Sequence, residues 1–541
     1  MTLLIDRRLL LKAGTLGLGV LSIPGGAAVL AARGFTHNVA SGEPRQHGVL
    51  LWTRYVPASG DTARIAWEVS ETPRFARIIA RGEATSESEH DHTVKVVAAG
   101  LAPGRTYYYR FRDRSGHASP VGRTRTLPDG PVASYRLALF SCSNLPFGWF
   151  NAYGHAAARD DIDLMVHCGD YLYEYDRGHY PGPREAAPGR IVEPANELIH
   201  LADYRIRYGA YRSDPDLQRL HQMYPMVAMW DDHESANDSW QGGAENHQPA
   251  TEGPWADRKA AAVRAYREWM PVNEDIWESY EIGDLATIFR PETRLTARTR
   301  QLTLGAALAG QTDIPAALAN FRDHQWLDPS RTLMGAEQEA WLAQGLRRSV
   351  GQGTKWQVLA QQVVMGTLAL PDEAAGWARA NAGQEARGRI AAGLAAAHAG
   401  LPFNFDSWDG YPAARRRVLQ SALDANANLV VLSGDSHNAW GFDLDIDGHP
   451  AAVEFAGQSV TSPGYESALP GVDMDAVTRA VIHRNPQLKW ANLSRRGYVT
   501  VELTPERVTG EWLMMDTIRQ RSTRLAGRNA MSVTRRASRF A

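Results

Sequence analysis

The chain has 541 residues, a length that exceeds a single small core and indicates two or three folded units. Hydrophobic residues make up 44% of it and charged residues 22%, which is the composition of a globular protein. The formal net charge of −2 gives no electrostatic basis for binding an anionic membrane, and we expect no stable nucleic-acid binding. Two cysteines, Cys142 and Cys168, are too few for a disulfide framework, although they leave one bridge open.

Residues 1–32 have the pattern of an export signal. Arg7 and Arg8 precede a mild, glycine-rich apolar stretch at 13–24, which is shorter than the roughly 20 residues of a transmembrane helix. Small residues at 28–32 follow, as a cleavage site requires. The paired arginines indicate the Tat export machinery as a partner, so we expect a periplasmic or secreted protein without a transmembrane anchor after cleavage. The alternative is a cytoplasmic protein in which the arginine pair occurs by chance.

Residues 33–130 have the pattern of short β-strands. Apolar or alternating runs predict strands at 48–53, 63–69, 93–97 and 106–111. Pro-Gly and Ser-Gly pairs mark turns, and no helical periodicity separates the runs. We therefore predict an N-terminal β-sandwich, joined to the rest by a proline- and glycine-containing linker at 126–131.

Residues 131–515 show a different pattern, in which apolar strand-like runs alternate with helical stretches. The predicted strands are 135–140, 162–167, 226–230, 285–289, 356–360 and 429–433, and the predicted helices are 258–269, 335–347 and 391–399. This alternation predicts a layered α/β domain. The remaining segment, 516–541, is basic: it has seven arginines and no acid from Arg519 to Arg539, and we expect a solvated tail or a last helix.

Four of the apolar runs end in reactive side chains. The clusters are Ser141-Cys142-Ser143-Asn144, Cys168-Gly169-Asp170-Tyr171-Leu172-Tyr173-Glu174, Asp231-Asp232-His233-Glu234 and Gly434-Asp435-Ser436-His437. In an open α/β sheet, ligands bind outside the carboxyl ends of the strands. We therefore expect the four clusters to converge on one site.

The residue types in these clusters favour a hydrolase with two metal ions. The sequence has no Gly-x-Ser-x-Gly, HExxH or zinc-ribbon pattern. Aspartates beside histidine can hold two cations about 3.5–4 Å apart, with one carboxylate bridging them. A thiolate and a phenolate favour a redox-type or trivalent metal over magnesium alone. Each cluster also has a structural explanation, as a turn, a helix cap or a core cysteine, and we assign Cys168 to the core.

The clusters resemble those of the PhoD-type alkaline phosphatases, a branch of the calcineurin-like metallophosphoesterases. Further similar stretches lie at 201–208, 408–412 and 460–463. The resemblance implies an α/β (α+β) fold, with an N-terminal β-sandwich followed by a layered calcineurin-like α/β sandwich.

The resemblance also implies a mixed Fe(3+)/Ca(2+) centre. It places iron on Cys142, Asp170, Tyr173 and His437, with Asp170 bridging, and calcium on Asp231, Asp232 and Asp435. His233 would face the scissile phosphate, and Asn237 is a further candidate ligand. One departure is Pro291-Glu292-Thr293-Arg294, where many members have Leu-Asp-Thr-Arg. An insertion-like stretch follows at 299–331, which can alter the pocket wall and the choice of substrate.

The expected activity is hydrolysis of phosphate mono- or diesters, with a role in phosphate acquisition. In this hypothesis a metal-bound hydroxide attacks phosphorus in line, and the catalytic residues are His233, as proton donor, Asp170 and Asp232. Substrates would be small phosphoesters, including phospholipid or nucleotide diesters. The alternatives are a phospholipase D-like phosphodiesterase and an exported binding protein with an inactive metal site.

Overall fold

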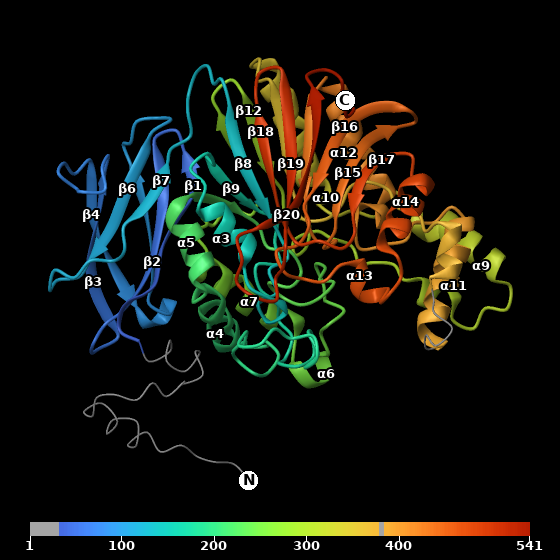
Figure 1. Cartoon of the computed structure of the whole chain (residues 1–541), viewed down its shortest axis with the longest axis horizontal. Helices are drawn as coiled ribbons and strands as arrows, with labels where there is room; N and C mark the ends of the chain where they lie inside the picture. Colours follow the sequence, from blue (N-terminus) through green and yellow to red (C-terminus); the bar gives the residue numbers. More distant parts are fainter. Residues whose placement is uncertain (1–31, 378–383) are drawn as a thin grey trace, which may run out of the picture.

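Two large β-sheets lie face to face, helices cover their outer faces, and a smaller sheet packs beside them at the N-terminal end (Figure 1). The computed structural model describes residues 32–377 and 384–541. The predicted export signal lies outside the described residues, except for its last residue. Among the residues that are described, no helix has both the length and the apolar character needed to cross a membrane.

The first sheet has nine strands and a parallel centre. Strands β8, β9, β10 and β1 are parallel, and antiparallel strands extend both sides. The strands in spatial order are β20 (Leu525–Thr534), β19 (Arg507–Met515), β18 (Gly497–Leu503), β8 (Tyr135–Phe140), β9 (Leu164–His167), β10 (Pro225–Ala228), β1 (Gly34–Arg45), β2 (Gly48–Val56) and β5 (Thr93–Ala99).

The second sheet has seven strands, of which four neighbours, β12, β13, β14 and β16, are parallel. In spatial order they are β11 (Glu278–Ile282), β12 (Ala286–Arg290), β13 (Trp356–Ala360), β14 (Leu429–Ser433), β16 (His449–Ala456), β15 (Ala439–Ile446) and β17 (Leu488–Asn492).

Side chains alternate between two cores along the central strands. In β8, Leu137 and Leu139 are buried between the two sheets, whereas Ala138 and Phe140 belong to the core under the helices. Strand β14 does the same in the second sheet, with Val430 between the sheets. Because both faces of these strands are buried, their sequences are continuous apolar runs, and this is why they could be recognised.

Helices cover the outer face of each large sheet. Those on the nine-stranded sheet are α3 (Asn151–Ala157), α4 (Leu201–Arg212), α5 (Pro215–Met223) and α7 (Trp255–Trp269). Those on the seven-stranded sheet are α10 (Gly335–Gly351), α12 (Pro412–Asp424) and α14 (Met474–Arg484). Short helices α6 (Pro249–Glu252) and α13 (Tyr465–Ala468) lie in connecting segments.

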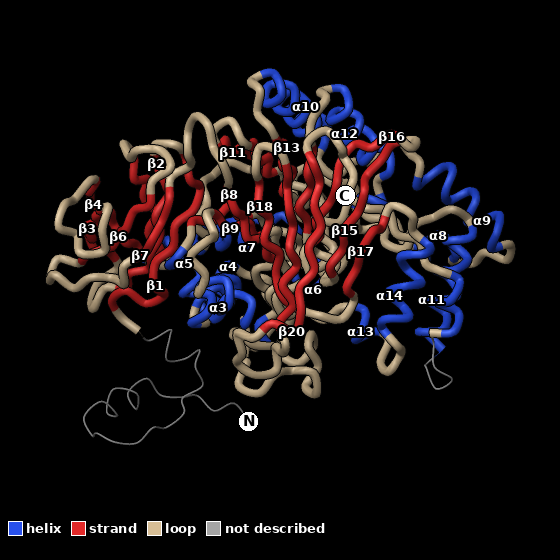
Figure 2. Tube along the Cα trace, turned by 45° about the horizontal axis from the view of Figure 1, so that its top comes forward, coloured by secondary structure: helices blue, strands red, loops and turns tan. Residues whose placement is uncertain are grey.

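The insertion-like stretch at 299–331 contributes to a lobe at one end of the molecule (Figure 2, right). This lobe contains α8 (Leu304–Leu308), α9 (Ile314–Phe321) and α11 (Gln384–His398). It has a small core of its own, in which Phe321 packs edge-on against Phe405 with ring centroids 5.6 Å apart.

The N-terminal region is sheet-rich, which agrees with the expected fold class. Its four-stranded sheet consists of β4 (Ala80–Glu87), β3 (Thr62–Ser70), β6 (Thr106–Arg112) and β7 (Gly122–Arg125). Ile65 and Tyr109 of this sheet pack against Val39 and Leu51 of β1 and β2, which form the opposite layer of a sandwich. That layer is hydrogen-bonded to β10 and is therefore continuous with the nine-stranded sheet. The domain boundaries at 32, 130 and 515 stay predictions.

The expectation of a solvated tail or last helix at the C-terminus is wrong. Strand β20 pairs with β19 along its length and forms the edge of the nine-stranded sheet. Half of its side chains are exposed, and only Val533 is fully buried. An edge strand that buries so little, with glycine, asparagine and serine among its residues, lacks the clear apolar pattern by which it could be recognised.

Candidate metal centre

The four clusters lie together just beyond the carboxyl ends of their strands. Cys142 follows β8, Asp170 follows β9, Asp231 to His233 follow β10, and Asp435 and His437 follow β14. Their ligand atoms form three groups in which every atom lies within 4.8 Å of the others; these are Cys142–Asp170–His437, Asp170–Asp232–His233 and Asp231–Asp232–Asp435. Tyr173 joins the first group, with its hydroxyl 2.9 Å from Asp170 Oδ2 and 3.1 Å from His437 Nε2. The structure thus brings together the predicted site residues of the four clusters.

The backbone at this site adopts a conformation that L-residues rarely take. Four residues have positive φ angles: Cys142 at 58°, Asp170 at 54°, Asp435 at 63° and His437 at 62°. Such residues cost about 1–3 kcal/mol each and persist only where surrounding contacts fix them. Their concentration here, at the ends of three different strands, indicates that the loops are shaped to present side chains.

Glu234 fixes two of these loops. Its buried carboxylate accepts hydrogen bonds from the backbone N–H groups of Asp170 (3.1 Å), Tyr171 (2.7 Å) and Asp231 (2.8 Å). Gly169 allows the loops to approach, because a Cβ there would lie 2.4 Å from that of Asp231. The β9 and β10 loops are therefore locked to each other directly behind the candidate ligands.

One side of the centre carries the softer donors. His437 Nδ1 donates to the carbonyl of Pro463 (2.8 Å), which leaves Nε2 as an acceptor facing Tyr173. Burial lowers the pKa of His437 to about 3, so its imidazole is neutral. Burial also raises the pKa of Cys142 and of Tyr173, and the charge of Asp170 adds to both effects. The thiolate and phenolate forms therefore require a positive charge beside them.

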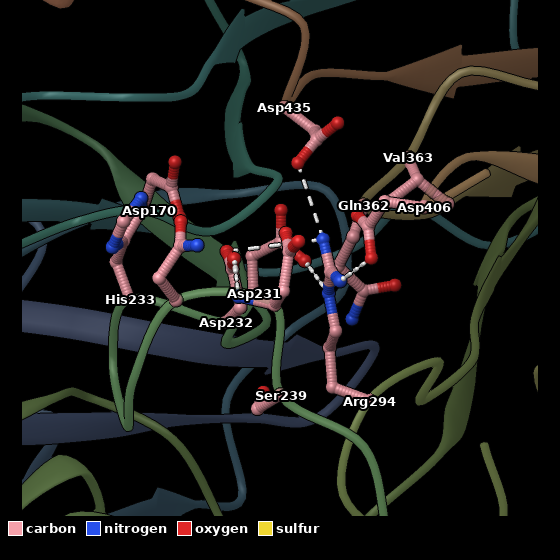
Figure 3. A network of polar contacts seen from close by, with 12 residues as sticks. Asp170, Asp231, Asp232, His233, Ser239, Arg294, Gln362, Val363, Asp406 and Asp435 are labelled. Carbon is pink, nitrogen blue, oxygen red and sulfur yellow. Dashed lines mark hydrogen bonds and ion pairs between the residues drawn. The ribbon is translucent and has the colours of Figure 1, made fainter. Parts of the chain in front are cut away.

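The other side is an array of carboxylates around one arginine. Figure 3 shows the guanidinium of Arg294 pointing at Asp231, Asp406 and Asp435. Its Nη1 lies 2.8 Å from Asp406 and its Nη2 lies 3.1 Å from Asp435, while Nε donates to Asp231. Asp232 is 3.8 Å away. The side chain of Arg294 is fully buried, so this cation is a fixed part of the site.

These contacts neutralise only part of the negative charge of the carboxylates. Burial raises the pKa of Asp170, and the charges of Asp232 and Asp231 raise it further. Burial also raises the pKa of Asp231 to about 6, although Arg294 opposes this. For Asp232 burial acts in the same direction, but Arg294 and His233 outweigh it and the pKa is lowered.

Unpaired oxygen atoms indicate what the site can bind. Within the described residues, Asp170 Oδ1, Asp231 Oδ2 and Asp232 Oδ1 are buried without a hydrogen-bond partner. Buried acceptors without a partner are costly, and a metal cation is the partner that suits several converging carboxylates. The donor set therefore fits two neighbouring cations, one with thiol, phenol and imidazole donors and one with oxygen donors.

His233 lies beside the shared carboxylates as an oriented cation. Its Nδ1 lies 2.7 Å from Glu174 Oε2. Burial alone would lower the pKa of His233, but Asp232, Glu174 and Asp170 raise it well above its usual range. Glu174 is itself held by the backbone N–H of Asn237 (2.8 Å) and by the side chain of Asn246 (2.9 Å).

Some functional side chains were not identified from the sequence. Glu174 and Glu234 lie within the recognised clusters but received no role, and neither did Arg294, the last residue of the departure at 291–294. Asp406 had no sequence signal, because it is an isolated residue in a loop. The side-chain amide of Asn237 donates to Glu245 (3.1 Å), and its role as a ligand stays a prediction.

The two cysteines are both free thiols, so the bridge that the sequence left open is not formed. Cys168 is buried in the core between the two large sheets, as expected, whereas Cys142 points to the site.

Comparisons with known proteins agree with the resemblance read from the four clusters. A family model described as "PhoD-like phosphatase" matches residues 137–512, and one described as "PhoD-like phosphatase, N-terminal domain" matches residues 23–128. Alkaline phosphatase D of Bacillus subtilis (strain 168) is 33% identical over 509 residues, covering 89% of this chain and 77% of the relative. A solved structure entitled "Structure of PhoD" has a TM-score of 0.77 and 29% identity, and the match covers 94% of this chain and 92% of that one. The chain therefore belongs to the PhoD-like phosphatase family and is a phosphatase, a hydrolase of phosphate esters.

Proposed function

We propose that the protein is an exported, metal-dependent phosphoesterase that hydrolyses phosphate monoesters, diesters or both, and that it serves phosphate acquisition. Two shared carboxylates support metal dependence: Asp170 and Asp232 each belong to two of the three donor groups. Two adjacent cations need shared ligands of this kind. Membership of a phosphatase family favours this enzyme over a binding protein with an inactive site.

The donor types support iron on one side and calcium on the other. Cys142, Asp170, Tyr173 and His437 would hold Fe(3+), because thiolate, phenolate and imidazole suit a transition metal. The oxygen ligands of Asp231, Asp232 and Asp435 suit Ca(2+), which binds carboxylates. When bound, these cations would supply Lewis acidity, which lowers the pKa of water and polarises phosphoryl oxygens.

His233 would be the proton donor. Glu174 holds its Nδ1, and a ring nitrogen of His233 lies within 4.8 Å of the carboxylates of Asp170 and Asp232. Against the effect of burial, Asp232 and Glu174 raise the pKa of His233. Glu174 is not a proposed metal ligand, so its charge still favours a protonated ring whose remaining N–H can protonate the leaving oxygen. Arg294 would hold Asp231 and Asp435 in place through the contacts described above.

Replacing Asp170 tests the shared carboxylate. Asp170→Asn removes one negative charge where two cations would meet, so we expect both metals to bind more weakly. Activity on every phosphoester should fall by at least ~10³-fold, about 4 kcal/mol of transition-state stabilisation. Elemental analysis and steady-state kinetics measure the two effects. Asp443→Asn, a buried aspartate of β15 outside the three groups, is the control and should keep its metals. Full metal content with normal turnover in Asp170→Asn would mean that Asp170 is misassigned.

Replacing His233 tests proton donation separately from metal binding. In His233→Asn we expect metal content close to that of the wild type and a turnover about 10²–10⁴-fold lower for alkyl phosphates. The loss should be smaller for p-nitrophenyl phosphate, because p-nitrophenolate leaves without needing a proton. Comparing kcat for the two substrate types checks this. An equal loss on both would exclude His233 as the donor to the leaving group.

Replacing Arg294 tests whether a divalent cation binds the aspartate array. Arg294→Met leaves Asp231 and Asp435 without their buried partner, which should lower the free energy of unfolding in chelator by about 3–5 kcal/mol. Millimolar calcium should restore part of this loss, because a cation bound by the folded state compensates the same charge. Thermal unfolding with and without calcium measures the effect.

Arg212→Met is the matched control for this experiment. Arg212 is equally buried, but it donates to the carbonyl of Trp269 and stacks over Trp52. Its loss of stability should not respond to calcium. If calcium stabilises both variants to the same extent, the aspartate array is not the calcium site.

Export is tested at the leader. Replacing Arg7 and Arg8 by lysine keeps the charge but removes the arginine pair that the Tat route requires. We expect the variant to stay in the cytoplasm, as measured by fractionation and immunoblotting. Unchanged export would show that another route is used and would leave the enzymatic proposal intact.

A further inference from the structure

A cavity of about 340 Å³ begins where the candidate metal centre ends. It lies within the long loop between β9 and α4, which Figure 1 shows in teal below the sheets. Tyr173 belongs to both places: its hydroxyl contacts Asp170 and His437, and the residue also lines the cavity. The ring of His233 lies 4.1 Å from that of Tyr173 and 5.5 Å from that of Tyr175, another lining residue. A group that leaves from phosphorus beside His233 would therefore be next to this cavity.

The walls of the cavity are mostly aromatic and apolar. Tyr180 lies with its ring 5.9 Å from Tyr173 and 5.5 Å from Tyr175, and Phe147 supports it from behind at 4.8 Å. Prolines, small aliphatic residues and the charged residues Asp176, Arg177 and Arg207 complete the walls. Four tyrosines line this space, and Tyr180 contacts the rings of Tyr173 and Tyr175, which favours a planar ligand that can stack on them.

Two buried polar atoms on the lining residues have no hydrogen-bond partner within the described chain. They are Oδ1 of Asn144, an acceptor, and Nη2 of Arg190, a donor. Asn144 is fully buried, and the side chain of Arg190 is 6% exposed. An unpaired buried polar group costs about 1–3 kcal/mol. Neither atom has accessible surface, and the guanidinium of Arg190 stacks over Trp149 and Phe150. A ligand in the cavity therefore meets the acceptor of Asp176 and the donor of Arg177 on the wall instead.

The cavity is held open by contacts outside it. Arg190 donates to Asp214 (2.6 Å) and to the carbonyl of Gly148 (2.8 Å), so its guanidinium is fixed. Arg519, from the C-terminal segment, donates to the carbonyls of Phe147 and Ala186, both at 3.0 Å. The walls are therefore anchored to the body of the protein, and a ligand would meet a preformed site.

We propose that this cavity binds the leaving group of the substrate, and that this group is a nucleoside, whose base is planar and has a hydrogen-bonding edge. The volume is at the lower end of the roughly 300–1,000 Å³ found for small-molecule sites, which suits one nucleoside rather than two acyl chains. In the reaction, the oxygen of water forms the new bond to phosphorus and the bond to the nucleoside oxygen breaks. That oxygen leaves with a proton from His233, and the proton that the attacking water loses returns to His233 by way of solvent. The inference rests on the proposed phosphoesterase and names its substrate class.

The test compares adenosine 5′-monophosphate with glycerol phosphate, two alkyl phosphates that differ in the leaving group. The wild type should have the higher kcat/KM for the nucleotide. Tyr180→Ala should lower the ratio of the two kcat/KM values about tenfold, since base–aromatic stacking is worth about 1–3 kcal/mol. Tyr108→Ala, a half-buried tyrosine in β6, is the matched control and should leave the ratio unchanged.

Binding of adenosine, measured by titration calorimetry, separates this inference from the proposed function because it needs no turnover. Adenosine should bind to the wild type and bind at least tenfold more weakly to Tyr180→Ala. Adenosine binding without hydrolysis of any phosphoester would overturn the proposed function and keep the cavity assignment. Equal turnover of the two substrates without adenosine binding would overturn the cavity assignment alone. A preference for dihexanoylphosphatidylcholine that Tyr180→Ala abolishes would assign the cavity to a lipid instead.

Discussion

The arrangement of the site depends on the burial of carboxylates close to one another. Asp170, Asp231, Asp232 and Asp435 converge within a few ångströms, and two charges 4 Å apart interact by roughly 4 kcal/mol at an effective dielectric of 20. The protein itself supplies two buried cations, Arg294 and His233. Some carboxylate oxygens have no partner, so Arg294 and His233 do not neutralise all of the negative charge at the site. The proposed metal ions would neutralise the negative charge that remains.

The carboxylates and the arginine that partly neutralises them come from both sheets. Asp231 follows β10 of the first sheet, whereas Arg294 follows β12 and Asp435 follows β14 of the second. The contacts of Arg294 therefore tie the two sheets together at the edge where their loops meet. The apolar core between the sheets fixes their separation, and so it also fixes the distances among the ligands.

The fold and the site could be predicted from the sequence where a strand buried on both faces is followed directly by functional residues. Strands β8, β13 and β14 were predicted with their observed bounds, because strands buried on both faces are continuous apolar runs. The clusters that follow such strands could be read directly. Arg294 and Asp406 could not, because their role arises from a contact across 112 residues with no local pattern. The antiparallel edge strand β20 was missed for the opposite reason, since it buries almost nothing.

Some residues of the site are held by buried contacts, whereas others lie in the outer part of a loop. Tyr173 contacts the candidate ligands and also lines the cavity, so a substitution there would disturb both the charge balance and the proposed leaving-group site. Tyr180 and the exposed Ile191 contribute to the cavity from the outer part of the loop, away from the backbone hydrogen bonds that Glu234 makes. Because loop residues of this kind tolerate change better than residues locked by buried hydrogen bonds, substrate preference can vary here while the charged centre is kept.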